Sequence, residues 1–221
     1  IPVYCGQKSE KEKFAGARAT YSIEAMMQDG KALQSGTSHN FGTNFSEPFE
    51  IKYLDKDGTQ KYAHETSWGT STRLIGAIIM THGDERGLKL PPMIAPYQVV
   101  VVPVAAHKEG VLEGAKAVAD KLTAAGLRVK FDDRDNVTPG WKFNEWELKG
   151  VPVRLAMGPR DLAGGTIELF RRDTLSKETV PQEGLADRVE GLLDEIQANI
   201  YAKALRFRDS MITRVDTYDE F

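Results

Sequence analysis

Apolar and polar residues alternate over short runs toward the N-terminus of the chain. Between residues 14 and 54 these runs are separated by Gly, Ser and Asn, a pattern typical of half-buried strands in an antiparallel sheet. The turn DKDG at Asp55–Gly58 lies between two of the runs and predicts a hairpin loop. A helix that ends near His82–Gly83 is expected next, because apolar residues follow at helical spacing: Leu74, Ile75, Ile78 and Ile79.

The pattern changes after a Pro-rich segment at residues 87–96, which predicts an irregular linker. The run YQVVVVPV that follows is continuously apolar, as in a strand buried on both faces of a sheet. Further strands are expected at LRVKFDD, VPVRLAM, TIELFRR and ETV. Apolar stripes predict helices at 111–122 and 185–200, and a third helix is expected at 138–149, with Thr138 as N-cap and Pro139 at its first position.

This order of elements predicts two different architectures in one chain. The first part reads as α+β with an antiparallel sheet, and the second as an α/β domain with a mixed five-stranded sheet. We expect domain boundaries that give residues 1–94, 95–203 and a short extension at 204–221.

Composition narrows the function classes. The 221 residues include 41% hydrophobic side chains, enough for two cores, and 28% charged side chains with a net charge of −3. Such a chain does not coat nucleic acid as a polycation, so any RNA contact must be local. A single cysteine, Cys5, excludes an internal disulfide framework and a zinc site built on several thiolates. This cysteine usage favours a reducing, cytoplasmic location. The sequence has no 18-residue apolar run and no signal-peptide pattern.

Two groups of polar residues in the first part are candidates for ligand binding. Gln34, Thr37 and His39 lie on a Gly-punctuated strand and offer directional hydrogen bonds to a sugar or carbonyl. Arg73 follows SWGTST at a strand–helix junction, where its planar fork suits a phosphate. From the residues alone, an ordinary edge strand and a surface Arg are the favoured interpretations, and Trp68 alone is more typical of a core.

The stretch DDRDNVTPGWKFNEWELKGVPVRLAMGPRDL is the main candidate for RNA binding. Aromatic rings stack on unpaired bases, a carboxylate accepts from the N1–H and N2–H₂ edge of guanine, and Arg or Lys donates to O6 and N7. Between Gly140 and Lys177 seven basic residues stand against five acidic ones, so binding would be selective. From the residues alone, a solvated helix face is the favoured interpretation of Glu147. Trp146 is expected in the core, and Trp141 or Phe143 is expected under a base.

Several blocks of sequence resemble, in the same order, the prolyl-tRNA synthetases of the eukaryotic and archaeal type: EKEKFAGA, TYSIEA, TSHNFGTNF, SWGTSTR, THGDERGLKLPP and DDRDNVTPGWKFNEWELKGVP. The resemblance covers nearly the whole chain. It implies the later part of a class II synthetase catalytic domain, including the third class motif, followed by an anticodon-binding domain. The first two class motifs would lie upstream of Ile1, so we expect the isolated 221 residues to be inactive.

For the first domain, the resemblance implies a site for ATP and proline. Arg73 would be the catalytic residue that clamps the ATP γ-phosphate, and Gln34 would lie near the ribose. Ser71 and Thr72 would lie beside the adenine and 3′-adenosine pocket. The residues implied on the proline side are Thr37, His39, Trp68 and Gly69.

For the second domain, the resemblance implies contacts with the two guanines that end a proline anticodon. Glu147, Arg154 and Asp161 match the guanine-reading residues. Arg160 is expected to contact a phosphate or a base edge, and Lys177 is a further candidate.

The resemblance also implies ligands and partners. These are L-proline, tRNA(Pro), ATP with Mg²⁺ and a second copy in a homodimer, with no DNA and no zinc. Three alternatives stay open: another class II synthetase for threonine, glycine or histidine, a non-catalytic synthetase-like protein that binds tRNA, and an unrelated two-domain protein with a nucleotide pocket.

Overall fold

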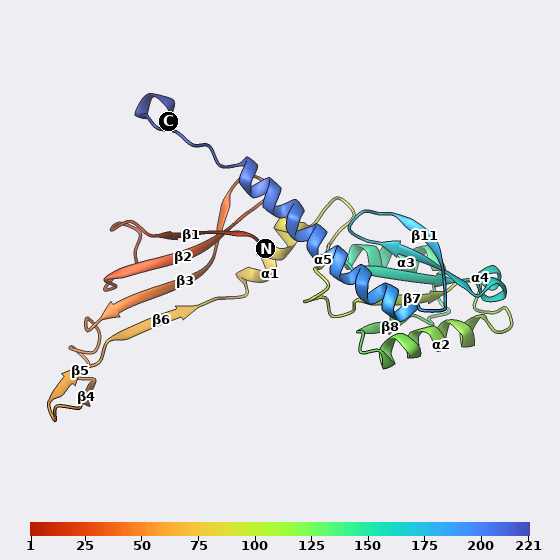
Figure 1. The fold of residues 1–221 in the computed structure, drawn as a ribbon, viewed down its shortest axis with the longest axis horizontal. Coiled ribbons are helices and arrows are strands. Elements are labelled where there is room, and N and C mark those ends of the chain that lie inside the picture. The colour runs from red at the N-terminus through yellow and green to blue at the C-terminus, as the bar shows by residue number, and fades with distance from the viewer. The chain divides into compact units, whose positions relative to one another are not determined.

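The computed structural model describes all 221 residues, which form two compact units (Figure 1). The first unit comprises residues 1–81 and 205–221, and the second comprises residues 82–204. The Pro-rich linker, at whose end we placed a domain boundary, therefore groups with the second unit.

The first unit contains a four-stranded antiparallel sheet with strand order β1-β2-β3-β6. A separate hairpin is formed by β4 and β5 around Asp55–Gly58, as the turn sequence predicts. The strands are β1 (Val3–Gln7), β2 (Ala19–Met26), β3 (Ala32–Gly42), β4 (Lys52–Leu54), β5 (Gln60–Tyr62) and β6 (Glu65–Gly69).

Helix α1 (Arg73–His82) follows β6 at the predicted place, but its buried side differs from the predicted stripe. Ala77 is fully buried and packs with Ala25 and Met27, whereas Ile75 and Ile79 are exposed. The small Ala side chain allows the helix to approach the sheet closely, and a count of large apolar residues misses this contact.

The second unit confirms the expected mixed five-stranded sheet, with order β11-β10-β9-β7-β8. β7 runs parallel to β8 and β9, whereas β10 runs antiparallel to β9 and β11. The strands are β7 (Val99–Pro103), β8 (Val129–Phe131), β9 (Val153–Met157), β10 (Thr166–Arg171) and β11 (Lys177–Pro181).

Both faces of this sheet are covered by helices. Val99 and Val101 pack in the larger core, with apolar residues of α2 (Val111–Ala124) and α5 (Leu185–Ser210). Val100 and Val102 point to the other face and pack against Trp146 of α3 (Pro139–Leu148). All four valines are fully buried, which explains why this strand has no alternation in its sequence.

The helices of the second unit agree with the sequence at some ends and differ from it at others. Thr138 caps α3 by accepting a hydrogen bond from the backbone N–H of Trp141 at 3.3 Å, and Pro139 occupies the first helical position, as predicted. A fourth helix, α4 (Pro159–Gly164), was not predicted, because six residues are too few for a periodic stripe. α5 continues ten residues past Ile200, the last position of its predicted stripe.

Candidate functional site

A bulge in β3 brings three candidate residues of the first unit to one face of the sheet. Ser22 of β2 lies opposite Thr37, and Glu24 lies opposite Gln34, so β3 has one more residue than β2 over this interval. Side chains alternate along a strand, and Gln34 and Thr37 would otherwise point to opposite faces. The bulge places Gln34 on the face that carries Thr37 and His39.

Trp68 lies on the opposite face of the sheet from Thr37 and His39. It pairs directly with Ser38, and directly paired residues share a face. Trp68 is 76% exposed and lines an apolar hollow of about 790 Å³ with Tyr21 and Ile23. Gly69 pairs with Thr37.

The His39 ring is fixed by its neighbours. Its Nδ1 lies 2.9 Å from the Thr20 hydroxyl. The ring stacks on Phe41 with an interplanar angle of 7° and also contacts Phe14, 5.1 Å away between ring centroids. Such a ring presents its remaining nitrogen in one direction, as recognition of a small ligand requires.

Arg73, the first residue of α1, lies beside Gln34. Its Nη1 donates to the Gln34 carbonyl at 3.3 Å, and its backbone N–H donates to the Ser71 hydroxyl at 3.3 Å. Thr72 is exposed next to them. Lys8, which the sequence analysis missed, donates its Nζ to Gln34 Oε1 at 2.5 Å. Two cations thus flank Gln34, an arrangement suited to an anionic phosphate chain.

In the second unit, Arg154 and Lys177 lie in one row across the sheet. Phe170 of β10 pairs with Lys177 on one side and with Arg154 on the other. All three therefore share the face that α3 covers. Lys177 is exposed, whereas Arg154 is only 5% exposed.

Arg154 is held between two aromatic rings. Its guanidinium carbon lies 3.7 Å from the Phe143 centroid and 4.6 Å from the Phe170 centroid. Nη2 donates to Glu168 at 2.9 Å, and the buried Nε has no hydrogen-bond partner. Burial lowers the pKa of Arg154, and the negative charge of Glu168 opposes that shift. An unpaired buried donor is costly unless a ligand satisfies it.

Glu147 lies near the C-terminal end of α3 and is already paired. Arg86, in the loop between α1 and β7, donates Nη1 to Glu147 Oε1 at 3.0 Å. The sequence analysis missed this partner, because 61 residues separate the two and no local pattern links them.

The two candidates of α4 differ in their surroundings. Arg160 is exposed. Asp161 accepts a hydrogen bond from the backbone N–H of Gly158 at 2.9 Å and thereby caps the helix. Asp161 thus has a structural role in addition to the predicted one.

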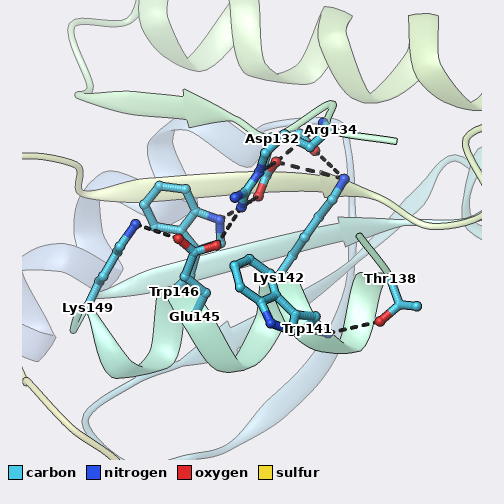
Figure 2. Close-up of polar contacts among 8 residues, drawn as sticks. All are labelled: Asp132, Arg134, Thr138, Trp141, Lys142, Glu145, Trp146 and Lys149. Atoms are coloured by element: carbon cyan, nitrogen blue, oxygen red, sulfur yellow. Dashed lines mark hydrogen bonds and ion pairs between the residues drawn. The ribbon is translucent and has the colours of Figure 1, made fainter. Parts of the chain in front are cut away.

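A buried carboxylate fastens α3 to the end of β8 (Figure 2). Asp132 accepts hydrogen bonds from the Trp146 indole N–H at 2.7 Å and from two nitrogens of Arg134 at 2.8 and 2.7 Å. Lys142 donates to the Asp132 carbonyl at 3.0 Å. Burial would raise the Asp132 pKa, but the hydrogen bonds from Arg134 and Trp146 and the charge of Lys142 lower it to about 2. The helix that carries Glu147 is therefore rigidly placed.

Nowhere do three His, Cys, Asp or Glu side chains gather so that they could hold a metal ion. No helix combines the length and the apolar character that crossing a membrane requires.

Known proteins resemble this chain in sequence. Residues 98–192 match the model of an anticodon binding domain family. The whole chain is 58% identical to a proline–tRNA ligase of Alkaliphilus oremlandii and 58% identical to one of Parabacteroides distasonis, covering 46% and 45% of those proteins. The chain is thus similar to proline–tRNA ligases along its whole length. It spans about half the length of the curated synthetases that it matches.

A solved prolyl-tRNA synthetase has the same fold. The Cryptosporidium parvum enzyme, crystallised with L-proline and AMP, superposes with a TM-score of 0.90 over 99% of this chain and 48% of its own, at 44% identity. The expected class II antiparallel sheet and the mixed anticodon-binding sheet are thus confirmed as prolyl-tRNA synthetase architecture.

Proposed function

We propose that this chain contributes part of the ATP and proline site, and the anticodon-reading domain, of an enzyme that charges tRNA(Pro) with proline. The observation that carries the proposal is the match of the entire chain to proline–tRNA ligases at 58% identity. These relatives favour proline over threonine, glycine or histidine, and an enzyme over a non-catalytic homologue.

The residues beside Gln34 fit the first chemical step. The proline carboxylate attacks the ATP α-phosphate in line, and pyrophosphate leaves. Such a reaction depends on positioning and charge compensation rather than on a covalent enzyme group. Arg73 and Lys8 would hold the phosphates, with Gln34 at the ribose and with Ser71 and Thr72 beside the adenine.

Thr37 and His39, on the same face as Gln34, would hold proline, with the Gly69 backbone next to them. The 3′-terminal adenosine hydroxyl of tRNA then takes the prolyl group from the adenylate. Mg²⁺ bound with ATP would offset phosphate charge. Glu24, opposite Gln34 in the sheet, would supply a carboxylate oxygen, the type of ligand that such an ion prefers.

Anticodon reading is assigned to the second domain, at residues 95–203. Glu147, Arg154 and Lys177 would contact the two guanines, and Arg160 and Asp161 would add contacts from α4. Glu147 belongs to α3, and the guanidinium of Arg154 lies over the ring of Phe143 on the same helix, which supports this assignment. We further propose a homodimer in the cytoplasm, on the ground of the family resemblance.

Amino-acid-dependent ATP–pyrophosphate exchange by the complete gene product tests the proposal. It is assayed with proline, threonine, glycine, histidine and alanine. Exchange with proline alone would establish reaction and substrate together. A folded protein that binds tRNA(Pro) but exchanges with no amino acid would contradict the catalytic part and leave a tRNA-binding role.

A further inference from the structure

The ion pair between Arg86 and Glu147 points to a residue of the anticodon site outside the matched anticodon-binding family region. Arg86 precedes residues 98–192, which that family model covers. Its side chain is 58% exposed, whereas that of Glu147 is 13% exposed. The pair thus presents an accessible guanidinium next to a nearly buried carboxylate.

One buried side chain fixes both partners of this pair. Arg172, 1% exposed, donates Nη1 and Nη2 to Asp84 at 2.9 and 2.6 Å, and donates Nε to the Glu147 carbonyl at 3.0 Å. Asp84 in turn accepts from the backbone N–H of Arg86 at 2.9 Å. The hydrogen bonds from Arg172 hold the pKa of Asp84 well below its ordinary range, so this clamp stays charged.

The loop backbone is joined to the end of α3 as well. Leu88 donates its N–H to the Leu148 carbonyl at 2.9 Å, and Leu90 donates to the Gly150 carbonyl at 3.1 Å. A Cβ on Gly87 would lie 2.5 Å from the Leu148 carbonyl oxygen, so the two segments are in tight contact. Arg86 therefore starts from a backbone as well fixed as that of Glu147.

The two side chains complement the pairing edge of guanine. That edge presents the O6 acceptor beside the N1–H and N2–H₂ donors. Arg86 uses Nη1 for Glu147 Oε1, and its guanidinium has further N–H groups to donate. Adenine would instead place an amino group against Arg86 and a bare ring nitrogen against the carboxylate. The pair also cancels the charge by which Glu147 alone would repel RNA phosphates.

We propose that Arg86 is a specificity-determining residue, which donates to O6 of an anticodon guanine while Glu147 accepts from N1–H and N2–H₂ of the same base. The proposal rests on the proposed role of this domain in reading the anticodon. It adds a residue from the loop after α1 to that reading.

The test is charging of tRNA(Pro) by the complete gene product, measured as kcat/KM. Wild type, Arg86→Ala, Arg86→Lys and Glu147→Gln are compared on native tRNA and on tRNAs with adenine or inosine at each anticodon guanine. Inosine keeps O6 and lacks only the N2 amino group. Lys116→Ala is the matched control, since Lys116 is also 58% exposed and ion-paired, with Asp120 at 2.7 Å, on α2.

Arg86→Ala is expected to lower kcat/KM on native tRNA by about ten- to a hundred-fold and to shrink the guanine-to-adenine penalty at one position. In Arg86→Ala, the loss of kcat/KM on replacing guanine with inosine stays as large as in wild type. In Glu147→Gln, that loss becomes smaller. Arg86→Lys keeps the charge and loses most of the discrimination. Lys116→Ala is expected to leave charging and proline-dependent pyrophosphate exchange at wild-type levels. The thermal unfolding midpoint of each variant checks that it is folded.

An equal loss on every tRNA, or a loss no larger than that of Lys116→Ala, would overturn the proposal for Arg86. If Glu147→Gln changed base discrimination and Arg86→Ala did not, Arg86 would serve only to neutralise Glu147. If neither variant altered discrimination at either guanine, the proposed anticodon role of this surface would fail with it.

Discussion

Trp146 donates its indole N–H to the carboxylate of Asp132 over 2.7 Å, within the core that α3 forms with the sheet. Asp132 is 1% exposed and Trp146 is 7% exposed, so neither group can replace the other with water. The hydrogen bond joins the end of β8 to the last turns of the helix that carries Glu147. It is a structural contact that fixes the position of α3 and therefore of Glu147, for which we propose a contact with the anticodon.

Replacing Trp146 with Phe should therefore destabilise the protein. The variant keeps an aromatic ring in the core but removes one donor from a buried carboxylate, a loss expected to cost about 1–3 kcal/mol. Chemical denaturation measures the free energy of unfolding. Trp141→Phe is the control on the same helix, because Trp141 is 49% exposed and should change stability by less than about 0.5 kcal/mol. Equal effects of the two variants would contradict the role of the indole N–H.

Asp132 also predicts a dependence of stability on pH. Its pKa in the folded protein is about 2, against an ordinary value of 3.8. A depressed carboxyl pKa contributes stability that is fully present above the unfolded value and is lost as the pH falls through the folded value. Asp132→Asn should flatten the decline in unfolding free energy between about pH 4 and pH 2 relative to wild type. The same slope in both proteins would show that other groups govern acid unfolding.

Gly150 should tolerate Ala poorly, for two separable reasons. Its φ is +74°, and a Cβ there would lie 2.6–2.7 Å from atoms of Leu88. Gly184 has a similar φ of +66° but open space around it. Gly184→Ala should cost about 1–2 kcal/mol from the backbone alone, and Gly150→Ala should cost about 1–3 kcal/mol more from overlap. Thermal unfolding distinguishes them, and similar losses would mean that the loop at Leu88 yields easily.

Removal of Arg172 should lower the free energy of unfolding more than removal of a surface ion pair does. Arg172→Ala leaves Asp84 and the Glu147 carbonyl without their buried partner, and we expect a loss of about 3 kcal/mol or more. Arg188, paired with Glu178 at 2.6 Å with both side chains about half exposed, supplies the comparison. Arg188→Ala should cost less than about 1 kcal/mol in the same denaturation assay. A small loss of unfolding free energy in Arg172→Ala would imply that the loop at Asp84 is held mainly by its backbone hydrogen bonds.

Arg73→Ala in the complete gene product should reduce proline-dependent pyrophosphate exchange by about a hundred-fold or more, because a preorganised phosphate contact is lost. Binding of tRNA(Pro), measured by filter retention, should remain at the wild-type level. Arg214→Ala, which removes an Arg whose side chain is 87% exposed, controls for net charge. Loss of tRNA binding together with exchange would contradict a role confined to ATP.

Regular elements could be predicted from the sequence wherever local patterns determine them. The continuous run of four valines predicts β7, and Thr138 with Pro139 predicts the start of α3, because burial on two faces and helix capping act within a few residues. The sequence does not predict α4, because six residues are too few to show a helical periodicity. The buried side of α1 was misassigned, since Ala77 packs more closely than the larger Ile75.

Contacts between distant segments could not be predicted in this way. Arg86 meets Glu147 only because Arg172 and the backbone bonds of Leu88 draw the loop to the end of α3. Lys8 meets Gln34 through strand pairing that no motif encodes. Resemblance to a family supplied the candidate residues, and the three-dimensional structure supplied their partners.

Because β3 has one extra residue between Gln34 and Thr37, the number of residues in this segment determines the face on which Gln34 lies. Deleting one residue there would restore plain alternation and keep every side chain of the proposed ATP and proline face in the sequence. It would also rotate Gln34 to the face that carries Trp68. A library that varies length by one at this point should therefore lose function more often than a library that varies the bulged Ser35 itself. In searches for distant relatives, an alignment gap between these two positions is a stronger warning of altered chemistry than a mismatch at either one.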